Sequence, residues 1–189
     1  GATVETIERI AHTVLASPHT IPVGEATWTS REVLDIEERF IASLDHTATP
    51  LEKPASNPML GVDQAEAVDT LVSTGSAVSV LIGPAGTGKT FTVAAIADAY
   101  RAGGYHVLGA APSARAALEL DAVGLSSRTL HRLLDDWRTG LEHPTAGSLL
   151  VIDEAGMADL RTLEATVTAQ TAVGGRVLLV GDHHQLPEV

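Results

Sequence analysis

The sequence predicts an α/β fold in which helices cover both faces of a mainly parallel sheet. Two observations carry this prediction. From residue 57 onward, short apolar segments alternate with segments of helical periodicity, the order that repeated strand–helix–strand units produce. The apolar segments are continuous rather than alternating in polarity, which is typical of strands buried on both faces. They lie at residues 77–82, 106–111, 148–153 and 176–181.

A small helical segment precedes this sheet domain. Residues 4–15 and 27–44 carry apolar side chains at helical spacing, and Thr29 lies three residues before Glu32, which predicts a capping box. A loop with three prolines follows. We therefore divide the chain into an N-terminal segment and linker, 1–56, and a sheet domain, 57–189. In the sheet domain we expect helices at 63–72, 89–103, 113–123, 126–137 and 159–173.

The composition is that of a folded protein. Of 189 residues, 44% are hydrophobic and 19% are charged, but only 3% are aromatic, so the core must consist of Val, Leu, Ile and Ala. The absence of cysteine excludes disulfides and thiolate metal sites. No apolar run approaches the length of a membrane span, and no signal peptide opens the sequence. We expect a cytoplasmic location.

The net charge of −12 argues against non-specific binding to nucleic acid over a broad surface. The charge is uneven, however. Residues 1–56 hold nine acidic side chains against four basic ones, whereas residues 89–138 hold six basic against five acidic. Any contact with a polyanion should therefore be local.

The segment GPAGTGKT matches the pattern G-x-x-x-x-G-K-[ST], and it follows a predicted strand and opens a predicted helix. Glycines let the backbone wrap closely around phosphates, and the N–H groups at the helix start face the same anion. Lys89 would reach the β- and γ-phosphates of a nucleoside triphosphate, and the Thr90 hydroxyl would bind Mg²⁺. The predicted nucleotide-binding residues of this segment are Gly83, Pro84, Ala85, Gly86, Thr87, Gly88, Lys89, Thr90 and Phe91.

Two acids follow the predicted strand SLLVI. Asp153 and Glu154 stand at its carboxyl end, where α/β sheets place ligands. Adjacent acids at a strand end are often a solvated turn, but after a phosphate-binding loop they predict catalysis. Asp153 would hold Mg²⁺, and Glu154 would polarise the attacking water, so hydrolysis is expected rather than binding alone.

The last predicted strand leads into GDHHQLPEV. The tip of such a strand should lie beside the γ-phosphate, where Gln185 could sense that phosphate or the attacking water and couple nucleotide state to motion. His183 and His184 do not have the spacing of metal ligands, and we expect no metal site there.

Together, GPAGTGKT, IDEAGM and GDHHQLP resemble the motifs of superfamily 1 DNA helicases of the RecD-like branch (superfamily 1B), in particular the helicase part of TraA/TraI-type conjugative relaxase-helicases. The resemblance covers residues 60–189, and a weaker one covers 27–40. It implies that residues 57–189 are the first RecA-like (1A) P-loop ATPase domain of such a plasmid-transfer motor, ending after the third motif.

The resemblance also implies roles for residues outside these motifs. Gln64, in LGVDQAEAV, would read the adenine edge with both amide groups and favour ATP over GTP. Five residues would lie along single-stranded DNA, namely Pro112, Ser113, Arg115, Thr129 and His131. A simpler interpretation, that Ser113 and Ser126 cap helices, is compatible with this role.

The implied partners are single-stranded DNA, a second RecA-like domain of the same parent chain that would supply an arginine to the γ-phosphate, and the conjugative transfer machinery. Two alternatives stay open. The chain could be a RecD-like or PhoH-like ATPase unrelated to conjugation, or a nucleotide-dependent interaction module without turnover. As an isolated domain, we expect it to hydrolyse ATP weakly or not at all.

Overall fold

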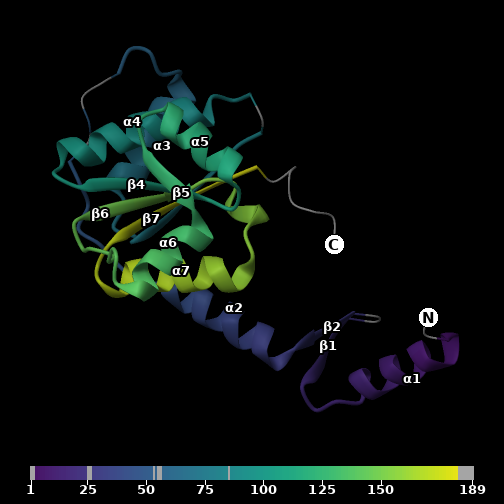
Figure 1. The fold of residues 1–189 in the computed structure, drawn as a ribbon. Helices are drawn as coiled ribbons and strands as arrows, with labels where there is room; N and C mark the ends of the chain where they lie inside the picture. Colours follow the sequence, from purple (N-terminus) through teal and green to yellow (C-terminus); the bar gives the residue numbers. More distant parts are fainter. Residues whose placement is uncertain (1–2, 25–26, 53, 55–56, 85, 183–189) are drawn as a thin grey trace. The chain divides into compact units, whose positions relative to one another are not determined.

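The computed structural model describes residues 3–24, 27–52, 54, 57–84 and 86–182. Ala85 and Gln185, both predicted to contact the nucleotide, lie outside these ranges, as do His183 and His184. The chain forms two compact units, Gly1–Arg39 and Phe40–Val189, and Figure 1 labels their helices and strands. No helix in the described ranges combines the length and the apolar character that crossing a membrane would require.

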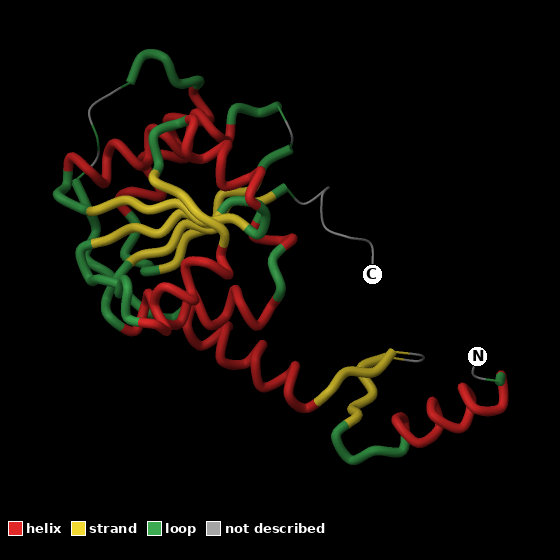
Figure 2. Tube along the Cα trace, viewed as in Figure 1, coloured by secondary structure: helices red, strands yellow, loops and turns green. Residues whose placement is uncertain are grey.

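The first unit contains helix α1 (Val4–Leu15), strands β1 (Thr20–Gly24) and β2 (Thr27–Ser30), and the start of helix α2 (Arg31–Leu44). The two strands form an antiparallel hairpin that the sequence analysis did not predict, drawn in yellow in Figure 2. Helix α2 begins at Arg31, so the residue in the cap position is Ser30 and not Thr29. The predicted capping box is therefore wrong, and the Ser30 hydroxyl accepts the bond from the Val33 N–H instead, at 3.2 Å.

The second unit is built on a five-stranded sheet with the order β3-β7-β6-β4-β5, and every neighbouring pair is parallel. This architecture confirms the predicted α/β class with a RecA-like sheet. Its elements are α3 (Val62–Ser73), β3 (Val78–Ile82), α4 (Lys89–Ala102), β4 (His106–Ala111), α5 (Ala114–Ala122), β5 (Ser126–Thr129), α6 (Leu130–Thr139), β6 (Ser148–Ile152), the 3₁₀ turn η1 (Ala155–Met157), α7 (Leu160–Ala172) and β7 (Arg176–Gly181).

Helices cover the two faces of the sheet in separate layers, with α3, α4 and α5 on one side and α6 and α7 on the other (Figure 1). Alternate residues of β7 pack against the two helix layers in turn. Leu178 and Val180 pack with the first layer, and Val177 and Leu179 pack with the second. All four are buried. A strand with both faces covered has no polar side, which explains its continuous apolar sequence.

Within the sheet unit, one element differs from the prediction. Residues 126–137 were expected to form one helix, but Ser126–Thr129 form the edge strand β5, which pairs with β4, and the helix begins at Leu130. Thr129 is its cap, since its hydroxyl accepts a bond from the Arg132 N–H at 3.3 Å. Ser126 therefore caps no helix. A four-residue strand carries too little periodicity to be recognised in the sequence.

The segment before α3 belongs structurally to the sheet unit, although the sequence analysis placed the boundary after residue 56. Thr47 bridges to Ser76, and Ala48 N–H donates to the Gly75 carbonyl at 2.8 Å. Leu51 packs against the core on the α3 and α4 side. These contacts join residues that are distant in sequence, so no local sequence pattern predicts them.

Candidate functional site

Two of the predicted catalytic residues, Lys89 and Glu154, lie near the carboxyl ends of β3 and β6, with the end of β7 between them. A hollow of about 380 Å³ lies there. The loop after β3 and the start of α4 contribute Gly86, Gly88, Lys89 and Thr90 to its wall, and the end of β6 contributes Asp153 and Glu154. The remaining lining residues are Glu119, Gly181 and Asp182. Residues that are about 65 positions apart in sequence thus face one cavity, as parallel strands of an α/β sheet allow.

The backbone of the loop adopts the conformation that its glycines permit. Gly86 and Gly88 have φ angles of 79° and 78°, in the left-handed region that other residues avoid. Helix α4 begins immediately afterwards at Lys89, so the first N–H groups of α4 have no partner within the helix. Such groups, together with the positive end of the helix, favour an anion such as a phosphate.

The Lys89 ammonium bonds to the loop itself. It donates to the Gly83 carbonyl and, at 2.9 Å, to the Pro84 carbonyl. It also lies 3.9 Å from the Asp182 carboxylate. Phosphate oxygens placed at the loop would compete with these neutral carbonyls for the ammonium, and charge-assisted bonds are the stronger ones.

Asp153 and Glu154 differ in their surroundings. An Asp153 carboxylate oxygen accepts a bond from the Glu154 backbone N–H at 2.8 Å. Burial raises the pKa of Asp153, while this bond and Lys89 act in the opposite direction. Burial also raises the pKa of Glu154, and the charges of Asp153 and Glu119 add to that effect. A carboxylate with a raised pKa is a better proton acceptor, which suits a residue that polarises water.

Glu154 holds an unusual backbone conformation, with φ 50° and ψ 36°. Among the described residues it is the only non-glycine residue with positive φ. This conformation costs a β-carbon-bearing residue roughly 1–2 kcal/mol. Strain of this kind is often found at functional sites, where the surrounding structure enforces it.

The oxygen atoms available to a divalent cation fit Mg²⁺. The Thr90 hydroxyl and the Asp153 carboxylate belong to side chains that line the same hollow, and both are the hard oxygen ligands that Mg²⁺ prefers. Two protein ligands are few, as expected for an ion that keeps several waters and binds nucleotide phosphates. Within the described ranges no cluster of three or more His, Cys, Asp or Glu side chains offers a complete protein cage for a metal.

Gln64 lies beside the phosphate-binding loop, on α3. Its side-chain oxygen accepts a bond from the Gly61 N–H at 3.0 Å, and its amide nitrogen donates to the Thr87 carbonyl at 3.2 Å. It lines a second hollow, of about 250 Å³, which Thr87 and Lys89 also line. Gln64 is thus next to the place where a nucleotide bound by the loop would lie, and its role towards adenine stays a prediction. Phe91, on the first turn of α4, is 43% exposed.

The five residues predicted to follow DNA lie near the carboxyl ends of β4 and β5. Pro112 and Ser113 follow β4 directly, Arg115 lies in the first turn of α5, and Thr129 and His131 stand at the junction of β5 and α6. Ser113 caps α5, as one interpretation of the sequence predicted, by accepting a bond from the Ala116 N–H at 3.1 Å. Strands β4 and β5 are paired neighbours, so the N-termini of α5 and α6, which follow them, lie next to each other at the same edge of the sheet.

Two acidic residues of the hollow were missed by the sequence analysis. Asp182 follows β7 just as Asp153 follows β6, so the same argument from strand ends could have found it. Glu119 lies in the middle of α5, where no motif marks it. Its carboxylate accepts a bond from the Arg115 side chain at 3.3 Å.

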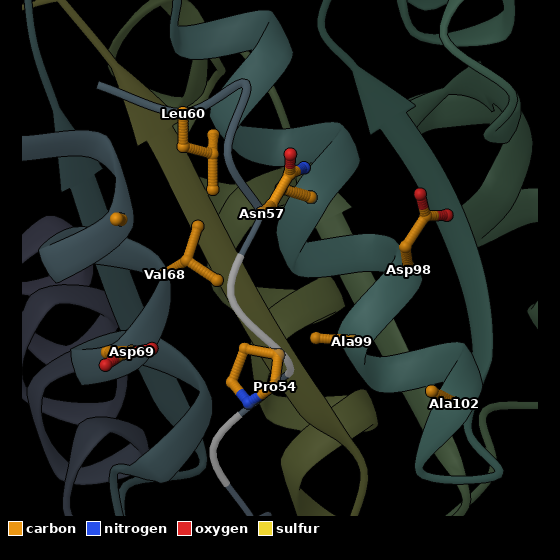
Figure 3. A pocket seen from close by; sticks show the side chains of 10 residues that line it. Pro54, Asn57, Leu60, Val68, Asp69, Asp98, Ala99 and Ala102 are labelled. Carbon is orange, nitrogen blue, oxygen red and sulfur yellow. The ribbon is translucent and has the colours of Figure 1, made fainter. Parts of the chain in front are cut away.

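A different hollow, of about 400 Å³, lies between α3 and α4 (Figure 3). Its wall includes Leu60, Val68, Asp69, Asp98 and Ala99. None of the predicted site residues lines it, and all of the catalytic candidates that the structure describes line the hollow at the strand ends. The hollow between α3 and α4 therefore holds none of the residues predicted for catalysis.

A parallel sheet, a glycine-rich loop that opens a helix, and two acids at the next strand but one define a RecA-like P-loop nucleotide-binding domain. Within this class, the chain belongs to the family described as AAA domain, whose model matches residues 59–189.

The curated proteins that resemble this chain include a protein named as a DNA helicase and proteins named as conjugal transfer proteins. The chain is 37% identical over 169 residues to the ATP-dependent RecD2 DNA helicase of Deinococcus radiodurans, covering 80% of this chain and 23% of that protein. It is 38% identical over 114 residues to a probable conjugal transfer protein TraA of Sinorhizobium fredii, covering 59% and 10%. It is 33% identical over 129 residues to the conjugal transfer protein TraA of Rhizobium radiobacter, covering 67% of this chain and 12% of that protein. The chain thus spans less than a quarter of the length of these relatives.

Proposed function

We propose that this chain is the ATP-binding and ATP-hydrolysing motor domain of a superfamily 1 DNA helicase that acts on single-stranded DNA within a conjugative transfer protein. The observation that carries the proposal is the meeting of Lys89, Thr90, Asp153 and Glu154 in one hollow. The names of the relatives, a RecD2 DNA helicase and TraA conjugal transfer proteins, support the helicase and conjugation parts.

In this proposal each residue of the hollow has a distinct task. Lys89 and the N–H groups at the start of α4 bind the β- and γ-phosphates. Thr90 and Asp153 hold Mg²⁺, which neutralises charge on the phosphate oxygens when bound. Glu154 orients and polarises the attacking water, and Gln185, outside the described residues, senses the γ-phosphate.

The DNA side of the proposal rests on the carboxyl ends of β4 and β5. The N-termini of α5 and α6 offer backbone N–H groups to phosphates, and Arg115, whose side chain is 91% exposed, offers a positive charge. In the parent chain, a second RecA-like domain would complete the DNA track and supply an arginine to the γ-phosphate, which is worth about a thousandfold or more in rate.

Turnover measurements test the ATPase part. We expect the chain to bind Mg-ATP and to hydrolyse it slowly, with Lys89→Ala as the blank. A wild-type chain that does not bind Mg-ATP would refute the proposal. Binding without any turnover, also in a longer chain that includes the second domain, would favour the interaction module.

Short oligothymidylate tests the DNA part. Arg115→Ala should weaken binding of the oligonucleotide and reduce the salt dependence of the affinity by about one counterion. Arg138→Ala is the matched control, since it removes the same charge from the far end of α6. Equal effects of the two substitutions would contradict a DNA track at the ends of β4 and β5.

A further inference from the structure

We propose that Gln64 positions the phosphate-binding loop, because its side-chain amide holds the peptide between Thr87 and Gly88 in one orientation. The inference rests on the proposed nucleotide site and adds a link between the base side and the phosphate side of that site.

The amide of Gln64 joins two segments that are 23 residues apart in sequence. On one side its oxygen accepts from the Gly61 N–H, just before α3 begins. On the other side its nitrogen donates to the Thr87 carbonyl, inside the loop. Among the described side chains, only that of Gln64 donates a hydrogen bond to this carbonyl, and it comes from a helix that packs against α4 through the core.

The peptide that Gln64 holds lies between two flexible points. Gly86 and Gly88, one on each side of Thr87, both have positive φ angles, and glycine passes readily between conformations. Without a partner for the Thr87 carbonyl, this peptide could rotate. A bond from a side chain that is itself tied to α3 prevents the rotation.

The direction in which the peptide is held suits a phosphate ligand. In a trans peptide the carbonyl and the following N–H point in opposite directions. The Thr87 carbonyl is directed to Gln64, and both residues line the smaller hollow. The N–H of Gly88 then points away from Gln64, and Gly88 lines the larger hollow together with Lys89 and Thr90. Gln64 thereby presents this N–H to the phosphate side.

The close approach also depends on the absence of a side chain at residue 88. A β-carbon added to Gly88 would lie 2.4 Å from the Gln64 amide nitrogen, much closer than real contacts allow. The glycine is thus required by the Gln64 contact as well as by its positive φ of 78°.

The Gln64 amide keeps spare capacity for a base. A primary amide has two N–H donors and two lone pairs on its oxygen, and one of each is used by Thr87 and Gly61. One donor and one lone pair remain. They complement adenine, which presents the N7 acceptor beside the N6 donor, whereas guanine presents two acceptors. Base selection and loop position would then depend on the same side chain.

Inorganic tripolyphosphate with Mg²⁺ tests the inference, because it carries phosphates but no base. Gln64→Met removes both hydrogen bonds without adding charge or losing much volume. We expect it to weaken tripolyphosphate binding about three- to tenfold, the value of one hydrogen bond. If Gln64 only reads the base, tripolyphosphate binds wild type and Gln64→Met equally, and the inference is wrong.

A second variant separates the loop contact from the start of the helix. Val62 is the first residue of α3 and is 84% exposed, so Val62→Gly should loosen the first turn through its low helix propensity while Gln64 keeps both bonds. We expect this variant to bind tripolyphosphate like wild type. An equal loss in both variants would assign the effect to the start of α3 and overturn the inference.

Binding to the wild-type chain shows whether the proposed nucleotide site or only the inference about Gln64 is wrong. If it binds neither Mg-ATP nor tripolyphosphate, the proposed nucleotide site itself is wrong. If it binds Mg-ATP but not tripolyphosphate, the nucleotide site stands and the inference fails, because a loop held by Gln64 should accept phosphates without a base.

Discussion

Lys89 and Asp182 face each other at the phosphate side of the nucleotide hollow, with the ammonium nitrogen 3.9 Å from a carboxylate oxygen. Their side chains are 19% and 5% exposed, so water screens this pair only partly. Burial raises the pKa of Asp153, and the nearby Lys89 charge offsets part of that rise. Lys89 therefore balances part of the acidic charge of the hollow in addition to being the proposed phosphate ligand, and Arg115 pairs with Glu119.

Replacing Lys89 by alanine should reduce Mg-ATP affinity at least about tenfold, because the phosphates lose a charge-assisted bond and meet the acids of the hollow directly. Titration calorimetry measures the change. Arg101→Ala is the matched control, since it removes the same charge from the other end of α4, about 18 Å away. Similar losses in both variants would show that net charge, not the Lys89 contact, determines the affinity.

Replacing Glu154 by glutamine should leave Mg-ATP binding within about twofold and reduce turnover roughly a hundredfold or more, the usual contribution of a general base. The amide keeps the size of the side chain but cannot accept a proton from water. A phosphate-release assay under saturating ATP measures turnover in a longer chain that includes the proposed second domain. Glu66→Gln, the same chemical change outside the hollow, serves as the control. Persistent hydrolysis would mean that another residue activates the water.

Replacing Glu154 by asparagine should stabilise the fold relative to the glutamine variant. Both changes remove the charge, but asparagine tolerates the left-handed conformation that Glu154 adopts. We expect a difference in the free energy of unfolding of about 0.5–1 kcal/mol, measured by urea denaturation. Identical unfolding curves would indicate that the backbone at Glu154 is not strained in solution.

Asp159 caps α7, where its carboxylate accepts bonds from the Thr162 N–H at 2.9 Å and from the Thr162 hydroxyl. Asp159→Ala should cost about 1 kcal/mol of stability, whereas Asp159→Asn, which can still cap, should cost less. The Thr162 bonds lower the pKa of Asp159. Its contribution is therefore complete above the unfolded-state pKa and is lost as the pH falls through the lower folded-state pKa. The difference between wild type and Asp159→Ala should shrink in acid, and a constant difference would contradict the cap.

Arg176 ties the start of β7 to three other segments. Its side chain is 1% exposed, donates to the Tyr100 hydroxyl at 2.8 Å and to the carbonyls of Thr49 and Thr74, and lies 5.5 Å from the Tyr100 ring centroid. Arg176→Met should cost about 2–4 kcal/mol, because the buried Tyr100 hydroxyl and two carbonyls lose their donor. Thermal and urea unfolding measure it, with the exposed Arg138→Met as the control. A cost below that of Tyr100→Phe, which removes one hydroxyl, would refute this role.

Most of the fold and the chemical residues of the site could be predicted because they are encoded locally. Continuous apolar strands, helical periodicity and the segment around Lys89 are patterns within about twenty residues. Asp153 could be assigned because a strand end in a parallel sheet is a known position for ligands. The edge strand β5 was missed because four residues carry little periodicity, and pairing with β4 overrides it.

The sequence by itself determined that this protein has a parallel α/β sheet, a phosphate-binding loop ending at Thr90 and two acids after a buried strand, since each depends on the backbone geometry of neighbouring residues. Only the tertiary structure decided that Glu119 lines the hollow, that residues 40–52 pack with the sheet, and that Gln64 bonds to Thr87. The physical reason is that these relationships join segments far apart in the chain. Their distances are determined by the packing of helices on the sheet, which no single stretch of sequence specifies.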